Sequence, residues 1–119
     1  MHGSLLPTHL DYGIERLNSE VSAWLRGEGA PPDFIHTSDG PTWARDFSDE
    51  VDDADCLVLD EVLERLGARR MIVGHTVPED GIGPLCDGRV WCIDAGLAAY
   101  YGARIEVLEI DGDRVRVLR

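Results

Sequence analysis

Residues 69–102 constrain this chain more than any other stretch, because they contain two short apolar runs that each end in a glycine-containing turn. Residues 71–73, Met-Ile-Val, are apolar and rich in β-forming side chains, and the run stops at Gly74, which predicts a buried strand. The strand delivers His75 to its C-terminal end, where α/β sheets place their chemistry. We therefore predict that the chain folds around this strand, with His75 at the functional edge of the sheet.

A second strand is expected over residues 89–93, after Asp87-Gly88 and before the tight turn at residues 94–96. The Pro- and Gly-rich loop between the two strands, residues 76–83, then converges with this turn on His75. We expect Gly74 to let the backbone pass close to a neighbouring segment. A histidine at a strand end is also common as a rim residue bonded to backbone, so residue type alone leaves both roles open.

Two amphipathic helices and a hairpin complete the expected elements. Apolar residues at helical spacing predict a helix over residues 14–25 and a second one leading into the first strand; they are Ile14, Leu17, Val21, Trp24 and Leu25, and then Leu59, Val62, Leu63 and Leu66. Asp52 or Asp53 is the expected N-cap of the second helix, and Gly67 its C-terminal end. Alternating residues over 105–118, around Asp111-Gly112-Asp113, predict a C-terminal β-hairpin with a type I′ turn.

The connection between the two helices, residues 28–53, has no periodicity and contains Pro-Pro and Asp-Gly-Pro. Irregular segments of this length inside a compact domain are usually functional or disordered. Trp43 and Arg45 stand out within it. A guanidinium binds anions through a planar fork of donors, although an exposed arginine is also ordinary solvated surface.

Composition excludes several classes of function. The 119 residues are enough for one domain, 1–119, and the net charge of −12 argues against a protein that binds nucleic acid by neutralising phosphates. No apolar stretch approaches the ~20 residues of a membrane helix, and the N-terminus lacks a signal-peptide layout, so we expect a cytoplasmic protein with no membrane contact. Cys56, Cys86 and Cys92 are odd in number and have no C-x-x-C spacing, which favours reduced thiols.

Four strings, in this order, carry a resemblance to a known family: HGSLLP at residues 2–7, GPTWARDF at 40–47, VGHT at 73–76 and GRVWCIDAGLAAYYG at 88–102. Together they resemble the C-terminal half of a calcineurin-like metallophosphoesterase, of the bacterial branch related to the phosphoprotein phosphatases. The departures from the family's pattern are Ser4, where a second glycine is usual, and Ala44, where an aromatic residue is often found. The resemblance implies an α/β fold that is a partial metallophosphoesterase fold: a mixed β-sheet with flanking helices and a C-terminal β-hairpin, with the N-terminal half absent.

The same resemblance implies the residues of the site. His2 and His75 match the family's two later histidine metal ligands, and Arg45 matches its phosphate-binding arginine. The implied cofactors are divalent ions of manganese, iron or zinc. The family's D-x-H, G-D-x-x-D-R and G-N-H-E motifs supply the remaining ligands, and none of the three occurs in this sequence. Two imidazoles alone would leave most coordination positions of the ions to water.

The implied activity is metal-dependent hydrolysis of phosphomonoesters, including those of phosphoprotein serine or threonine, by a complete enzyme to which this chain contributes one part. Without the three motifs we expect the chain to be inactive alone. Its expected partners are a phosphorylated substrate, a matching N-terminal half or a second copy of itself. The alternative is a non-catalytic acidic α/β remnant that acts as an interaction module. A small metal-binding or redox domain built on His2, His75 and the cysteines is a third, weaker reading, because no ligand spacing supports it.

Overall fold

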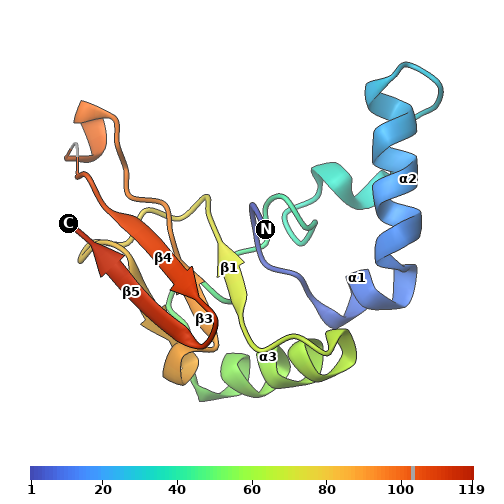
Figure 1. The fold of residues 1–119 in the computed structure, drawn as a ribbon. Coiled ribbons are helices and arrows are strands. Elements are labelled where there is room, and N and C mark those ends of the chain that lie inside the picture. The colour runs from blue at the N-terminus through green and yellow to red at the C-terminus, as the bar shows by residue number, and fades with distance from the viewer. Residues whose placement is uncertain (103) are drawn as a thin grey trace.

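The computed structural model describes residues 1–102 and 104–119 and shows a mixed α/β arrangement of short elements (Figure 1). The helices are α1 Pro7–Tyr12, α2 Ile14–Leu25 and α3 Asp53–Leu66, with single 3₁₀ turns η1 Asp33–His36, η2 Cys86–Gly88 and η3 Ala99–Tyr101. The strands are β1 Met71–Val73, β2 Gly83–Leu85, β3 Val90–Cys92, β4 Val107–Asp111 and β5 Arg114–Leu118. Among the described residues, no helix is long and apolar enough to cross a membrane.

The central sheet has the strand order β1-β3-β2. Strand β3 runs parallel to β1, with Met71 opposite Val90, and antiparallel to β2, with Leu85 opposite Val90. The expected mixed β-sheet with flanking helices is therefore confirmed, as are the strands predicted from the two apolar runs. Strand β2 was not anticipated: Gly83 was placed at the end of the predicted loop, and both Gly83 and Pro84 have low strand propensity.

The hydrophobic core lies between α3 and the sheet. Its fully or nearly fully buried side chains are Leu59, Val62 and Leu63 of α3, Met71 and Val73 of β1, and Val90 and Cys92 of β3, joined by Leu5 and Phe47. Asp52, one of the two predicted candidates, is the N-cap of helix α3, and its carboxylate accepts hydrogen bonds from the Ala54 and Asp55 amides. Gly67 in the left-handed conformation is the C-cap, as expected. Core packing therefore fixes β1 against α3, and with it the position of the residues that follow β1.

Helix α2 has the predicted bounds but contributes little to this core. Leu17 is its buried residue, and Leu25 at its end is 73% exposed. The Trp24 ring meets the ring of His36 edge to face, with centroids 5.5 Å apart. Figure 1 shows α2 and the β4–β5 hairpin at opposite sides of the molecule.

The C-terminal hairpin is confirmed, but its turn differs from the expected one. The register pairs Asp111 with Arg114, so the turn consists of Gly112 and Asp113, and of these two only Gly112 has a positive φ. A type I′ turn needs positive φ at both central residues, whereas type II′ needs it at the first alone. The hairpin is anchored by Glu106, whose carboxylate accepts hydrogen bonds from the Ile82 amide at 2.7 Å and from Arg119 at 2.8 Å.

The expectation of reduced thiols is wrong for two of the three cysteines. Cys56 of α3 and Cys86 of η2 form a disulfide, with Cα atoms 5.4 Å apart, while Cys92 is a free, buried thiol. The two partners lie 30 residues apart in the chain. No local spacing indicates this pair, because the packing of α3 against the sheet is what brings the cysteines together.

Candidate active site

The first residues of the chain lie along the free edge of β1. The Met1 ammonium donates a hydrogen bond to the Ile72 carbonyl at 2.7 Å, and the Gly74 amide donates to the Met1 carbonyl at 3.1 Å. This pairing holds His2 beside the C-terminal end of β1. The rings of His2 and His75 consequently lie against each other, with centroids 4.3 Å apart.

Residues 3–4 also fasten the irregular segment that carries Arg45. The Gly3 amide donates to the Pro41 carbonyl at 3.2 Å, and the Ser4 amide donates to the Ala44 carbonyl at 2.6 Å. The buried Ser4 hydroxyl accepts a hydrogen bond from the Phe47 amide at 3.0 Å, which gives this departure from the family's glycine a structural role. Arg45 is thus held between two anchored backbone positions.

The backbone of Met1 and His2 does pass beside Gly74, but the approach that excludes a side chain occurs at Gly3. A Cβ at Gly3 would lie 2.8 Å from the Ala44 carbonyl oxygen, whereas a Cβ at Gly74 would meet its nearest neighbour, the His2 carbonyl oxygen, at 3.7 Å. The first distance is a clash and the second is an ordinary contact. The absence of a side chain at Gly3 is therefore what lets the segment with His2 pass the segment with Arg45.

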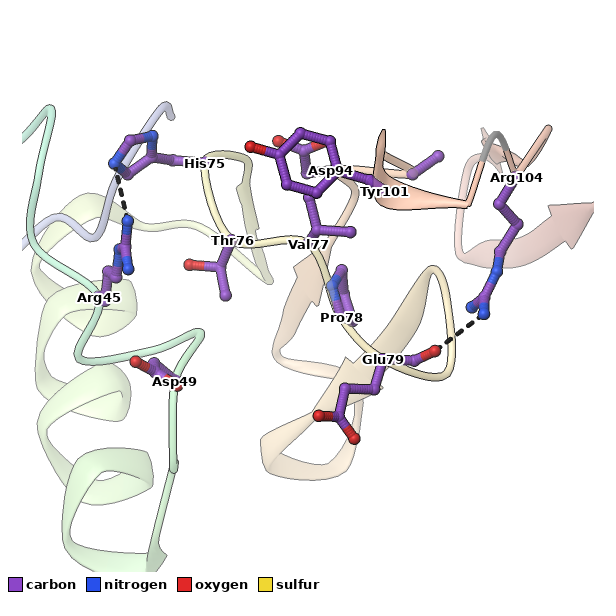
Figure 2. A pocket seen from close by; sticks show the side chains of 11 residues that line it. Arg45, Asp49, His75, Thr76, Val77, Pro78, Glu79, Asp94, Tyr101 and Arg104 are labelled. Atoms are coloured by element: carbon purple, nitrogen blue, oxygen red, sulfur yellow. Dashed lines mark hydrogen bonds between the residues drawn. The ribbon is translucent and has the colours of Figure 1, made fainter. Parts of the chain in front are cut away.

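His75 is the point where these segments meet. Its backbone adopts the left-handed region, with φ of 67°, which a non-glycine residue occupies only when its surroundings enforce it. The Arg45 guanidinium donates from Nη2 to His75 Nε2 at 3.2 Å, as Figure 2 shows. Trp43 completes the surroundings, edge to face with His75 at a centroid distance of 4.9 Å.

The electrostatics favour a neutral His75. Burial lowers the pKa of His75 from its ordinary value, and the charges of His2 and Arg45 lower it further, while Asp94 opposes the shift. A guanidinium has donors and no acceptor, so His75 Nε2 must accept the hydrogen bond and the imidazole proton must lie on Nδ1. Arg45 therefore also fixes the tautomer of His75.

A cavity of about 620 Å³ opens beside this pair. Figure 2 shows Arg45 and His75 on one side of it and Arg104 on the other, with Val77, Pro78 and Tyr101 between them. The Arg104 guanidinium is held by a hydrogen bond to the Glu79 carbonyl at 2.8 Å. Three carboxylates also line the cavity, those of Asp49, Glu79 and Asp94.

The structure brings together all three residues that the sequence singled out, since His2 and Arg45 each contact His75. Their roles as metal ligands and phosphate-binding residue remain predictions. Sequence reasoning did not find Asp49, Asp94, Tyr101 or Arg104 as cavity residues. The sequence could have indicated Asp94, because it follows β3 just as His75 follows β1. Neighbouring parallel strands end at the same edge of a sheet, so the two side chains are expected to lie close together.

The residues around His2 and His75 do not form a complete set of ligands for the expected divalent metal. His2 and His75 could offer two imidazole nitrogens, but within residues 1–102 and 104–119 no group of three or more histidine, cysteine, aspartate or glutamate side chains is arranged to hold an ion. Metal sites in proteins use three or more protein ligands or a set of carboxylates. An ion at this pair would need donors besides these two residues, and we derive no chemical step through it.

Comparison with known proteins finds similarity to phosphatases over most of this chain. No family model matches it. It is 37% identical over 119 residues to Shewanella-like protein phosphatase 2 of Arabidopsis thaliana, covering 95% of this chain and 30% of that protein. It is 28% identical over 115 residues to an uncharacterized protein of Schizosaccharomyces pombe, covering 92% of this chain and 35% of that protein.

The solved structures show the same fold in a larger protein. The chain superposes with a TM-score of 0.75 and 21% identity on a cold-active protein tyrosine phosphatase, covering 98% of this chain and 36% of that one. A cold-active protein tyrosine phosphatase of a psychrophilic Shewanella species gives a TM-score of 0.74 at 22% identity. The chain thus spans about a third of the length of the proteins it matches.

These findings correct the resemblance to a calcineurin-like metallophosphoesterase. The matching phosphatases bear the names Shewanella-like protein phosphatase and cold-active protein tyrosine phosphatase, and none is named a calcineurin-like metallophosphoesterase. The four strings that carried the resemblance are short, and each is weak alone. They located residues that meet in space, but did not establish the family to which these residues belong.

Proposed function

We propose that this chain supplies the phosphate-binding part of a phosphatase that hydrolyses phosphomonoesters, phosphorylated protein side chains among them. The observation that carries the proposal is the convergence of Arg45, His75 and His2, from three distant parts of the sequence, with Arg45 and His75 lining one cavity and His2 packed on His75. The likeness to a protein phosphatase over 95% of the chain supports it.

Arg45 is the residue suited to the phosphate. Its side chain is exposed, and the hydrogen bond to His75 uses one of five N–H donors, which leaves a fork for two phosphate oxygens. Because a guanidinium keeps its charge at all working pH values, it would bind the phosphate oxygens in both the ground state and the transition state. His75 holds the guanidinium in place without placing a negative charge beside it, as a carboxylate partner would.

Binding of inorganic phosphate to the 119-residue chain tests this role directly. In a titration followed by NMR, we expect the signals of the Arg45 and His75 side chains to shift and Arg45→Ala to abolish the effect. Arg114→Ala is the matched control, because Arg114 lies at the hairpin turn and does not line the cavity. Equal phosphate affinity in Arg45→Ala and the unaltered chain would refute the proposal.

Hydrolysis is a separate measurement. The chain spans 30% of the Arabidopsis phosphatase, and we propose that turnover needs groups from the remainder of such a protein. We therefore expect no hydrolysis of an aryl phosphate by the 119 residues alone, with or without added manganese. Turnover that disappears in His75→Ala would instead show that these residues contain a complete active site.

A further inference from the structure

Arg45 lies between two hollows, and the second one differs from the cavity described above. This second hollow, of about 500 Å³, is lined by His36, Ser38, Trp43 and Arg45. None of the described residues lining it carries a carboxylate, whereas the larger cavity contains those of Asp49, Glu79 and Asp94. In a chain with a net charge of −12, a hollow with a guanidinium, an imidazole and a hydroxyl but no lining acid is the more favourable one for an anion.

Trp43 forms the apolar wall of this hollow. Half of the Trp43 surface is exposed, although the neighbouring residue Ala44 is buried. The Trp43 ring lies edge to face against the ring of His75. Its amide donates to the Gly40 carbonyl at 2.9 Å, so the backbone that presents the indole is part of a closed turn. An exposed indole on a fixed backbone, two residues from the arginine, is a preformed surface for another flat ring.

The second hollow is rigid on its other side as well. A Cβ at Gly40 would lie 2.2 Å from the Phe34 carbonyl oxygen, so the missing side chain allows η1 to pack directly against the turn that carries Trp43. The Thr42 hydroxyl adds a hydrogen bond to the Ile35 carbonyl at 2.9 Å. These contacts fix η1, which carries His36, against the turn that carries Trp43, and both residues line the second hollow.

We propose that Trp43, with His36 and Ser38, binds the organic group of an aryl phosphomonoester whose phosphate lies at Arg45. The substrate class is a flat aromatic ring that carries the phosphate directly, as a phosphotyrosine side chain does. The inference rests on the proposed function and adds to it the residue that selects the ester group. Aromatic pairing with the indole should favour such a ring over a small alkyl group roughly 3- to 10-fold in affinity.

The test compares phenyl phosphate, methyl phosphate and inorganic phosphate binding to the isotope-labelled 119-residue chain by NMR. The three indole N–H signals, from Trp24, Trp43 and Trp91, are assigned with single Trp→Phe variants. We expect phenyl phosphate to bind roughly 3- to 10-fold more tightly than methyl phosphate and to shift the Trp43 signal most. Trp43→Leu, which keeps apolar bulk without a ring, should bring the ratio of the two affinities close to one, and Trp43→Phe should retain most of the preference.

Tyr100→Ala is the control for loss of an exposed aromatic residue, because Tyr100 is 89% exposed and lines neither hollow. It should leave the preference for phenyl phosphate intact. Loss of the preference in Tyr101→Ala but not in Trp43→Leu would place the ring in the larger cavity and overturn the inference. Equal binding of the two esters, with Arg45-dependent phosphate binding intact, would overturn it too, whereas loss of all phosphate binding would refute the proposed function itself.

Discussion

The helix–sheet core and the two site segments, residues 1–5 and 40–48, are held together in different ways. The helix–sheet core consists of the buried side chains of α3, β1 and β3, which recur at the periods of a helix and a strand. The site segments contain little regular structure, and backbone hydrogen bonds across Gly3 and Ser4 fix them. The difference shows that an irregular segment can be positioned firmly without any periodic pattern in its sequence.

Phe47 is where the two regions meet, and its removal should have the largest effect. The side chain is fully buried in the core cluster, while its amide is bonded to the Ser4 hydroxyl of the other site segment. Phe47→Ala should lower the free energy of unfolding by about 3 to 5 kcal/mol and weaken phosphate binding as well. Chemical denaturation measures the first effect, with Leu57→Ala as control because Leu57 is 71% exposed. A loss under 1 kcal/mol would mean that the site segments are independent of the core.

The disulfide should affect the core without affecting the site. Cys56 and Cys86 close a loop with a sequence separation of 30, for which chain entropy predicts a loss of about 3 to 4 kcal/mol on reduction. The folded protein should still bind phosphate, since neither cysteine lines the hollows at Arg45. Thermal unfolding with and without a reductant measures this, and the variant with both residues changed to serine should not respond to the reductant. An unchanged melting temperature on reduction would contradict the prediction.

Gly3→Ala and Gly74→Ala compare two glycines that flank the same histidine pair. The clash of the new methyl group with the Ala44 carbonyl should make Gly3→Ala destabilising by roughly 1 to 3 kcal/mol, and should displace Arg45 from His75. Gly74→Ala should be tolerated, because its nearest neighbour is at an ordinary contact distance. Phosphate affinity measured for both variants should fall in the first and not in the second. The reverse order would show that Gly74, as the sequence first suggested, is the position of close approach.

This contrast explains how far the sequence could predict the structure. Periodicity located α2, α3, β1, β3 and the hairpin, because apolar side chains at regular spacing report burial. It could not locate β2, the Cys56–Cys86 pair or the contact at Gly3, since each depends on which distant segments meet. Arg45 and His75 were found from local strings, yet the cavity beside them includes Asp49 and Arg104, which only the folded chain brings near.

The smallest expected effect is on the protonation of His75, and it tests whether the site segments act on the core strand at all. Burial and the charges of His2 and Arg45 lower the pKa of His75 below its ordinary value of 6.5. Between the lowered pKa and 6.5 the unfolded chain binds more protons than the folded one, so stability should rise with pH across this window. The contribution of His75 to stability is complete above pH 6.5 and is lost as the pH falls through this window.

An NMR titration of the His75 ring should therefore give a titration midpoint below pH 6.5. Arg45→Ala should raise this midpoint, and Arg114→Ala should leave it unchanged. Asp94→Asn should lower it further, because the Asp94 carboxylate stabilises the charged imidazole. A midpoint that does not respond to Arg45→Ala would show that the guanidinium is not held against His75. The convergence of residues on which the proposed function rests would then be refuted.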